Sequence, residues 1–301
     1  MMRRLAVMIA GAAMSLAFPL AAQPPGADPV LTAKERKVAP HVWMIEGYPN
    51  AYIVVGSTGT LVVDTGMGTP NGRFIAAAAK RVSRGGKLYL AMTHEHPEHA
   101  AGVAGFPPET VILRSRAQQR DLETSAPRLL ASFRGRSPEW ARMLEGADYG
   151  KASVLFDHDY RLNLGDVTVR LVQVPPAHTN ADLVAFVETD GALISGDLVQ
   201  NRTVPNPIGS EVSIASWLKG LDEVQALKPR LVLPDHSPPG GGGMVAEQRA
   251  FFVDVSKRAA AAKAAGRNAE DLLTELRGVY GDWRNAQNLK RVADQAFAEA
   301  S

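Results

Sequence analysis

Three of the seven histidines in the chain fall within one stretch of six residues, which reads His-Glu-His-Pro-Glu-His over positions 94–99. The stretch follows a short apolar run that reads as a buried strand. Residues two apart on extended backbone point the same way, so His94 and His96 can hold one metal ion together. The proline interrupts the strand, and Glu98 and His99 then face a different point nearby. This spacing indicates two adjacent metal ions.

The metal has to be held without sulfur, because the chain contains no cysteine. Disulfides, thiolate nucleophiles and thiolate metal sites are therefore excluded. Imidazole and carboxylate ligands suit Zn²⁺, which needs no thiolate. We therefore expect Zn²⁺, with two ions per chain, although iron or manganese could use similar ligands.

Four more metal-competent side chains lie just beyond apolar, strand-like runs elsewhere in the chain. They are Asp64, His178, Asp197 and His236, which follow the runs 61–63, 167–174, 192–195 and 231–233. A single Asp after a strand is usually a turn residue or a helix cap, but the four together converge on one edge of a sheet sandwich. His41 and His158 lack this placement, and we interpret them as structural or surface residues.

The elements that must position these side chains alternate between strand-like and helix-like runs. We expect strands at 42–45, 51–55, 61–63, 88–92, 111–113, 153–156, 161–164, 167–174, 183–188, 192–195 and 231–233. We expect helices over 71–84, 117–144 and 214–227, and from about 244 to the end. Two sheets covered by helices accommodate this order, which predicts an α+β fold, a four-layer αββα sandwich with extra C-terminal helices. The sandwich and these helices form one domain over 39–301.

The first 22 residues have the pattern of a secretory signal. A basic start with Arg3 and Arg4 precedes an apolar run over 5–20 and then small residues. We expect cleavage after Ala22, a loose lead-in over 23–38, and a periplasmic or secreted protein that does not associate with a membrane once the signal is removed. An uncleaved anchor is the alternative, but the run is short for a membrane span.

Composition excludes some partners. The 301 residues carry a formal net charge of +2, and no block of like charge occurs. Nucleic acid is therefore not expected as a partner. We expect a small-molecule substrate, and the oligomeric state is not specified by the sequence.

Five segments, taken in order, resemble the metallo-β-lactamase superfamily of metallohydrolases. They are Asp64-Thr65-Gly66, the 94–99 stretch, Ala177-His178-Thr179, Ser195-Gly196-Asp197 and 233–236. The resemblance covers roughly residues 40–240, and the ordered set is much more specific than any one segment.

The resemblance implies roles for each candidate residue. The first metal ion would be held by His94, His96 and His178, and the second by His99 and His236 together with residue 98. Asp197 would bridge both ions or bind the second. Asp64 and Glu98 are the acidic residues expected in the catalytic machinery, with Asp64 orienting a ligand histidine or loop. A water or hydroxide between the ions would be the nucleophile.

Two positions depart from the usual pattern of this family. Glu98 stands where Asp is usual, and it would either bind the second ion from a shifted position or leave that site weak. Asp235 stands where Gly usually precedes the last histidine. It either tolerates the turn there or forms a hydrogen bond with His236.

The resemblance favours hydrolysis of a carbonyl-type bond in an amide or lactam, a lactone or a thioester, as in a β-lactamase-like enzyme. Asp at position 197 is the pattern of the thioesterase, lactonase and general hydrolase branches, whereas export suits β-lactam hydrolysis. A penicillin-type carboxylate would need a cation, for which Arg202 is the candidate and Lys219 a second one. The alternatives are a mononuclear-iron redox enzyme of the persulfide dioxygenase type, or a non-catalytic metal-binding protein. A helical insertion over 114–150 would shape or cover the pocket.

Overall fold

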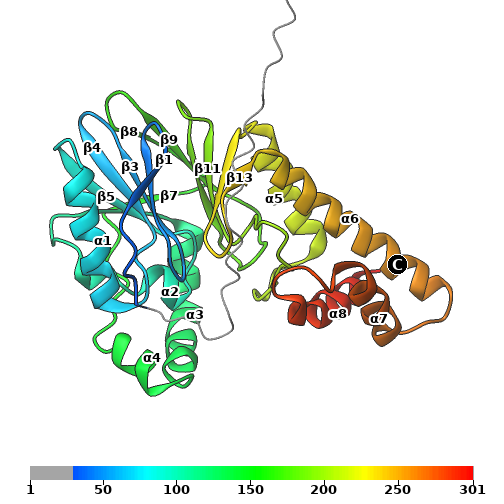
Figure 1. Ribbon diagram of the computed structural model, residues 1–301. Helices are drawn as coiled ribbons and strands as arrows, with labels where there is room; N and C mark the ends of the chain where they lie inside the picture. Colours follow the sequence, from blue (N-terminus) through cyan, green and yellow to red (C-terminus); the bar gives the residue numbers. More distant parts are fainter. Residues whose placement is uncertain (1–29, 301) are drawn as a thin grey trace, which may run out of the picture.

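The computed structural model describes residues 30–300, which form two facing sheets with helices outside them (Figure 1). The expected signal over 1–22 and its cleavage point lie outside the described residues. In strand order, the first sheet contains β1 (Arg36–Ala39), β2 (Val42–Ile45), β3 (Ala51–Val55), β4 (Gly59–Val63), β5 (Lys87–Ala91), β6 (Val111–Ser115) and β7 (Val154–Phe156). The second contains β13 (Gly240–Gly241), β12 (Leu231–Pro234), β11 (Ala192–Gly196), β10 (Leu183–Val187), β9 (Thr168–Gln173) and β8 (Asp159–Asn163).

Strand direction determines which loops meet. In the first sheet β4, β5 and β6 run parallel to one another. In the second sheet β11 and β12 are parallel, and β9 shares their direction because both β9 and β11 are antiparallel to β10. Parallel strands bring their carboxyl ends to the same edge of a sheet. The loops after β4, β5, β9, β11 and β12 are the ones that carry the candidate ligands.

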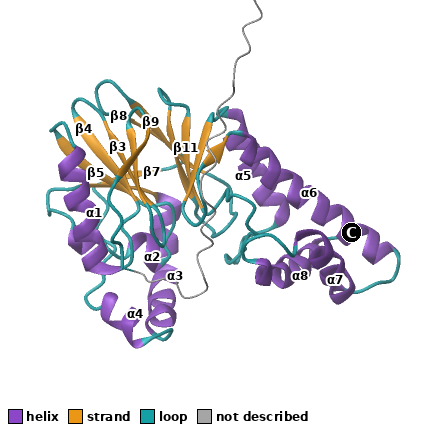
Figure 2. Cartoon of the chain, in the orientation of Figure 1, coloured by secondary structure: helices purple, strands orange, loops and turns teal. Residues whose placement is uncertain are grey.

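Apolar side chains on both sides of each sheet explain the layers. Leu61 and Leu171 belong to the buried cluster between the two sheets. Helix α1 (Gly68–Val82) covers the outer face of the first sheet with Ile75 and neighbouring alanines. Helices α5 (Ile214–Ala226) and α6 (Gly243–Ala264) cover the second sheet (Figure 2). The predicted four-layer αββα sandwich is confirmed.

The expected C-terminal helices are α6, α7 (Ala269–Tyr280) and α8 (Leu289–Glu299), with the 3-10 turn η2 (Ala286–Asn288) before α8. Their buried residues join the core cluster of the second sheet, so these helices pack on their own chain. Trp217 of α5 is 1% exposed in that cluster and donates its indole N–H to the carbonyl of Leu198 at 3.1 Å. None of the described helices is long and apolar enough to cross a membrane.

A helical insertion separates β6 from β7, as expected. It consists of α3 (Arg116–Arg134) and α4 (Pro138–Met143), joined by a turn over 135–137. Ser115 caps α3 and Ser137 caps α4, each through its side-chain oxygen. Phe133 and Met143 belong to a small buried cluster beneath the insertion. The turn between the two helices is thereby held close to the body of the sandwich.

Several boundaries differ from the expectation. Residues 36–38, expected in the loose lead-in, belong to β1, a short edge strand whose polar residues hide the strand signal. The histidine stretch contains a one-turn helix, α2 (Pro97–Ala100), followed by the 3-10 turn η1 (Val103–Gly105). Proline is well suited to the first position of such a turn. Residues 240–241, expected in a loop, pair with β12 as β13.

The two sheets are tied together near the histidines without any ion. The Tyr52 hydroxyl donates to the carbonyl of Pro234 at 2.6 Å, and the backbone N–H of Asn50 donates to the carbonyl of Asp235 at 2.7 Å. The side chain of Asn50 also donates to the Pro234 carbonyl at 2.9 Å. These bonds join β3 and the loop before it to the end of β12.

Candidate metal centre

The predicted ligands follow the ends of several strands and lie close together. The loop after β5 supplies the 94–99 stretch, while His178, Asp197 and His236 follow β9, β11 and β12. Both sheets therefore contribute to a single centre. The structure brings together all the predicted histidine ligands, Glu98 and Asp197.

The first ligand group consists of His94, His96 and His178, whose candidate ligand atoms all lie within 4.8 Å of one another. His178 Nε2 lies 3.3 Å from His96 Nδ1. The rings of His94 and His178 are 4.8 Å apart between centroids and nearly perpendicular. All three residues are buried. This is the trio that the family resemblance assigns to the first metal ion.

The second ligand group consists of Glu98, His99 and His236. The Nε2 atoms of the two histidines face each other at 3.1 Å. Asp197 stands between the groups, with Oδ2 at 3.3 Å from His178 Nε2 and Oδ1 at 3.6 Å from His236 Nε2. A carboxylate in this position can contact an ion in either group.

The unpaired atoms of the centre fit metal ions. Within residues 30–300, the buried atoms His94 Nε2, His96 Nε2 and Glu98 Oε2 have no hydrogen-bond partner. Buried polar atoms are rarely left without a partner, and two imidazole nitrogens rarely face each other without something between them. The donor set of nitrogen and carboxylate oxygen is one that Zn²⁺ prefers. The residues therefore fit the predicted zinc ions.

The electrostatics favour the neutral form of three ligands, His94, His96 and His236. Burial, reinforced by the neighbouring histidines, lowers the pKa of His94 and of His96 well below the ordinary value. Burial also lowers the pKa of His236 to about 4. Burial alone would raise the pKa of Asp197, but the charges of His236 and the other histidines lower it to about 2. Neutral imidazole and ionised carboxylate are the forms that bind metal.

Asp64 follows β4 and fixes the orientation of His99. Its carboxylate lies 2.8 Å from His99 Nδ1 and accepts hydrogen bonds from the backbone N–H and hydroxyl of Thr93, at 2.7 and 2.8 Å. Burial opposes the charged form of His99. The charge of Asp64, together with hydrogen bonds from His99 to Asp235 and Asp64, nevertheless holds the pKa of His99 well above the ordinary value. With Nδ1 bonded to a carboxylate, Nε2 is left to face the centre.

Asp235 lies in the turn after β12, and its carboxylate faces His99 instead of His236. Its carboxylate lies 3.3 Å from His99 Nδ1 and accepts a bond from the Thr93 hydroxyl at 3.4 Å, so it supports His99 rather than His236. Burial, and then the neighbouring charge of Asp64, raise the pKa of Asp235 well above its ordinary value. Two buried carboxylates thus share one imidazole.

Aromatic side chains and one arginine border the centre. The ring of Tyr48 lies 4.7 Å from His236 and 6.2 Å from Trp140, between centroids. Phe133 lies 6.3 Å from His96. The guanidinium carbon of Arg136 lies 3.6 Å from the centroid of Phe133. The insertion over 114–150 therefore borders the metal centre, as the sequence suggested.

Arg202, the predicted contact for a substrate carboxylate, is engaged elsewhere. Its guanidinium pairs with Asp282 at 3.0 Å and lies 5.8 Å from the centroid of Trp283, both in the C-terminal region. His41 is tethered to Asp190 through its ring and backbone N–H, at 2.8 Å each, and His158 is largely exposed.

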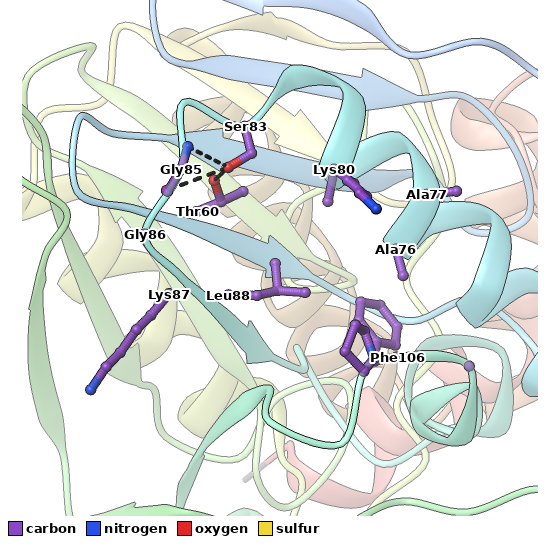
Figure 3. A pocket seen from close by; sticks show the side chains of 13 residues that line it. Thr60, Ala76, Ala77, Lys80, Ser83, Gly85, Gly86, Lys87, Leu88 and Phe106 are labelled. Atoms are coloured by element: carbon purple, nitrogen blue, oxygen red, sulfur yellow. Dashed lines mark hydrogen bonds between the residues drawn. The ribbon is translucent and has the colours of Figure 1, made fainter.

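A separate cavity of about 670 Å³ lies at the other edge of the first sheet, near the amino ends of β4 and β5 (Figure 3). Leu88 and Phe106 give it an apolar lining, and the hydroxyl of Thr60 donates to that of Ser83 at 2.9 Å. None of its lining residues belongs to either ligand group. Lys87 lines the cavity at the start of β5, whereas the histidine stretch follows the end of that strand. The cavity is therefore separate from the candidate metal centre.

An αββα sandwich with paired histidine and carboxylate groups at one edge defines the metallo-β-lactamase class of folds. The sequence matches the model of the metallo-beta-lactamase superfamily over residues 44–236, and the chain belongs to that superfamily. A curated relative, a linear primary-alkylsulfatase from Pseudomonas sp. (strain ATCC 19151), is 24% identical over 216 residues. The match covers 61% of this chain and 40% of the relative, so the chain spans less than half of that protein's length.

Solved structures of known proteins share the fold. The inverting sec-alkylsulfatase Pisa1 from Pseudomonas sp. superposes with a TM-score of 0.68 at 15% identity, covering 87% of this chain and 50% of its own. A metallo-beta-lactamase family protein from Thermus thermophilus gives 0.61 at 17% identity, covering 87% and 94%. The FIM-1 metallo-beta-lactamase from Pseudomonas aeruginosa, in its mono-zinc form, gives 0.57 at 17% identity, covering 75% and 98%.

Sequence reasoning missed several residues that hold the ligands in place. The backbone carbonyl of Asn206 lies 2.7 Å from His178 Nδ1, and the side chain of Gln200 donates to Asp197 Oδ1 at 2.9 Å. Burial raises the pKa of Asp182 to about 6, and its carboxylate accepts bonds from the backbone and hydroxyl of Thr179. Gln200 lies three residues after Asp197, but an amide at that spacing has many structural uses and gives no specific signal.

Proposed function

We propose that this protein is a metal-dependent hydrolase with two zinc ions per chain. The observation that carries the proposal is the meeting of two ligand groups around one carboxylate, Asp197, at 3.3 and 3.6 Å from their histidines. Membership of a superfamily composed mostly of metal-dependent hydrolases supports it. A non-catalytic binding protein would not require so complete a set of histidine and carboxylate ligands.

The chain's own residues prepare the centre for hydrolysis. Neutral His94 and His96 leave lone pairs for an ion, and Asp64 keeps the Nε2 of His99 turned inward. Asp197, ionised at any pH above about 2, supplies negative charge between the groups. When bound, zinc lowers the pKa of its water to about 7 and polarises the bond to be cleaved.

We propose two candidate classes of substrate. We favour a carbonyl-type bond of an amide or lactam, a lactone or a thioester, because Asp at position 197 matches the general hydrolase pattern. A sulfate ester is the second candidate, and the specific observation in its favour is the match to a curated linear primary-alkylsulfatase. A mononuclear-iron redox enzyme is less well supported, because it would use one ligand group and this centre has two.

Metal analysis and parallel assays test the function. The full chain without its first 22 residues should bind two zinc ions and hydrolyse at least one of nitrocefin, a thioester, a lactone and an alkyl sulfate. Replacement of His96 and His178 by Ala should abolish turnover of that substrate. A folded protein that binds no metal, or that loads zinc and cleaves none of the four, would refute the proposal.

We also propose that the protein is exported to the periplasm or secreted. The basic start and apolar run of residues 1–20 support this. Expression of the full chain in a Gram-negative host, followed by fractionation and N-terminal sequencing, should give a periplasmic protein beginning at Gln23. A cytosolic, unprocessed chain would contradict export without affecting the metal chemistry.

A further inference from the structure

We propose that Arg136 binds an anionic group of the substrate, and that the aromatic rings beside it hold an apolar portion of the same molecule. This inference rests on the proposed function, because it names the class of substrate that the metal centre receives. The class is an amphipathic anion whose charged group is a sulfate or a carboxylate.

Arg136 is held in position at the rim of the centre. It lies in the turn between α3 and α4, and its guanidinium carbon is 3.6 Å from the ring centroid of Phe133 and 4.9 Å from that of Trp140. Arginine stacked on aromatic faces loses less freedom when it binds an anion, since its planar fork is already oriented. Phe133 is itself buried and contacts His96, one of the ligands.

Aromatic rings connect Arg136 to the centre. Its guanidinium carbon lies 4.9 Å from the ring centroid of Trp140. The Trp140 ring is 6.2 Å from the ring of Tyr48, which is 4.7 Å from the ring of His236, all between centroids. The guanidinium also forms a hydrogen bond with the Tyr48 side chain. Arg136 is therefore linked through Tyr48 to the second ligand group.

Arg136 nevertheless has no carboxylate partner. Among residues 30–300, ion pairs within 4.0 Å engage other exposed arginines, including Arg81, Arg161 and Arg202, but none engages Arg136. The carboxylate of Glu98 belongs to the ligand group of His99 and His236 and would be used by the metal. Apart from its hydrogen bond with Tyr48, an exposed, stacked guanidinium without a carboxylate has further N–H donors for an incoming anion.

The surroundings are suited to an apolar portion. Three aromatic rings form one wall. The ring centroid of Trp140 lies 6.2 Å from that of Tyr48 and 5.4 Å from that of Phe133. Tyr48 also contacts His236, so the wall continues to the ligands. Arg202, by contrast, is paired with Asp282.

Binding of non-hydrolysable probes tests the proposal separately from catalysis. Octanesulfonate and nonanoate share an eight-carbon tail and differ in the anionic group, and octan-1-ol carries a similar tail without charge. Calorimetric titration is performed on the mature-length chain, both metal-free and zinc-loaded, with Arg136→Gln, Arg136→Lys and Arg128→Gln. Arg128 is an exposed arginine of α3 in the same insertion, and Arg128→Gln is the charge-matched control.

Arg136→Gln should weaken binding of the preferred anion by on the order of 10- to 100-fold, the range for a lost hydrogen bond to a charged group. Octanol binding should not change, Arg136→Lys should fall between, and Arg128→Gln should match the parent. A preference for octanesulfonate would indicate a sulfate ester, and one for nonanoate a carboxylate. Equal anion binding by the parent and Arg136→Gln, or no preference of the parent for either anion over octanol, would overturn the inference. If no substrate is hydrolysed but Arg136→Gln still loses the anion, only the proposed function fails.

Discussion

Replacing Asp64 by Asn should remove one zinc ion selectively. The carboxylate lies 2.8 Å from His99 Nδ1 and accepts two bonds from Thr93. Asn has only one oxygen, so its amide N–H₂ would face either the N–H of His99 or a donor of Thr93. The His99 ring would then lose the partner that keeps Nε2 directed at the centre. His94, His96 and His178 do not depend on this bond.

The expected magnitude follows from the contacts. Loss of a carboxylate that orients a metal-binding histidine typically reduces metal affinity about 10- to 100-fold, which corresponds to about 1.4–2.7 kcal/mol. Asp64 has a φ of 68°, a left-handed backbone conformation that Asn adopts as readily as Asp. Backbone strain therefore contributes little to the difference, and the effect reports the lost bond.

Zinc titration against a chelator of known affinity measures both sites. The variant should keep one tightly bound ion and release the other at about 10- to 100-fold higher zinc concentration. Asp166→Asn is the control, because Asp166 is exposed and pairs with Arg84 on the surface. Two ions bound with unchanged affinity in Asp64→Asn would refute the assignment of Asp64 as the residue that orients His99.

Other outcomes follow from the same structure. Glu98→Gln should lower the zinc content from two ions toward one per chain by elemental analysis, whereas Glu98→Asp should retain both; full loading of Glu98→Gln would exclude the carboxylate as a ligand. Trp217→Ala should lower the free energy of unfolding by about 3–5 kcal/mol in urea titrations, because a fully buried ring is lost, and a loss below about 1 kcal/mol would contradict its place in the core. Gly72→Ala should also destabilise, by about 1–3 kcal/mol, because a Cβ would lie 1.9 Å from the carbonyl oxygen of Gly102; unchanged stability would show that the helix can shift. Burial lowers the pKa of folded His236 to about 4, so between about pH 4 and 6.5 the unfolded chain binds more protons at this residue, and the contribution of His236 to the stability of the metal-free protein should fall as the pH drops through that window; the urea midpoint of the parent should therefore fall relative to that of His236→Asn, and a constant difference between the two would refute this.

The sequence predicted much of the sandwich because its strands are short, apolar and bounded by turn residues. The expected strands 183–188 and 192–195 form the hairpin of β10 and β11, and the Asp190-Gly191 dipeptide between them favours such turns. β1 escaped because it lies at an edge, where Arg36 and Lys37 are compatible with solvent on one side. Edge strands are weakly encoded by hydrophobicity, since only part of their surface is buried.

The histidine ligands were predictable because each follows a recognisable strand, and strand ends converge. The residues that form hydrogen bonds to these ligands were not predictable, because they come from unrelated loops. Asp235 was expected either to tolerate the turn or to form a hydrogen bond with His236, but its carboxylate lies beside His99. Arg136 gave no signal either, since its proximity to the centre depends on how the α3–α4 turn packs.

The hydrogen bonds from Asn50 and Tyr52 to the end of β12 have a consequence for how metal is acquired. They fix the spacing of the two halves of the sandwich in the polypeptide itself, before any ion arrives. A metal ion that binds here would therefore meet imidazoles that are already close together, and little of its binding free energy would be consumed in assembling them. Without these side-chain hydrogen bonds, as in Asn50→Ala combined with Tyr52→Phe, part of the metal-binding free energy would be spent on bringing the two sheets together.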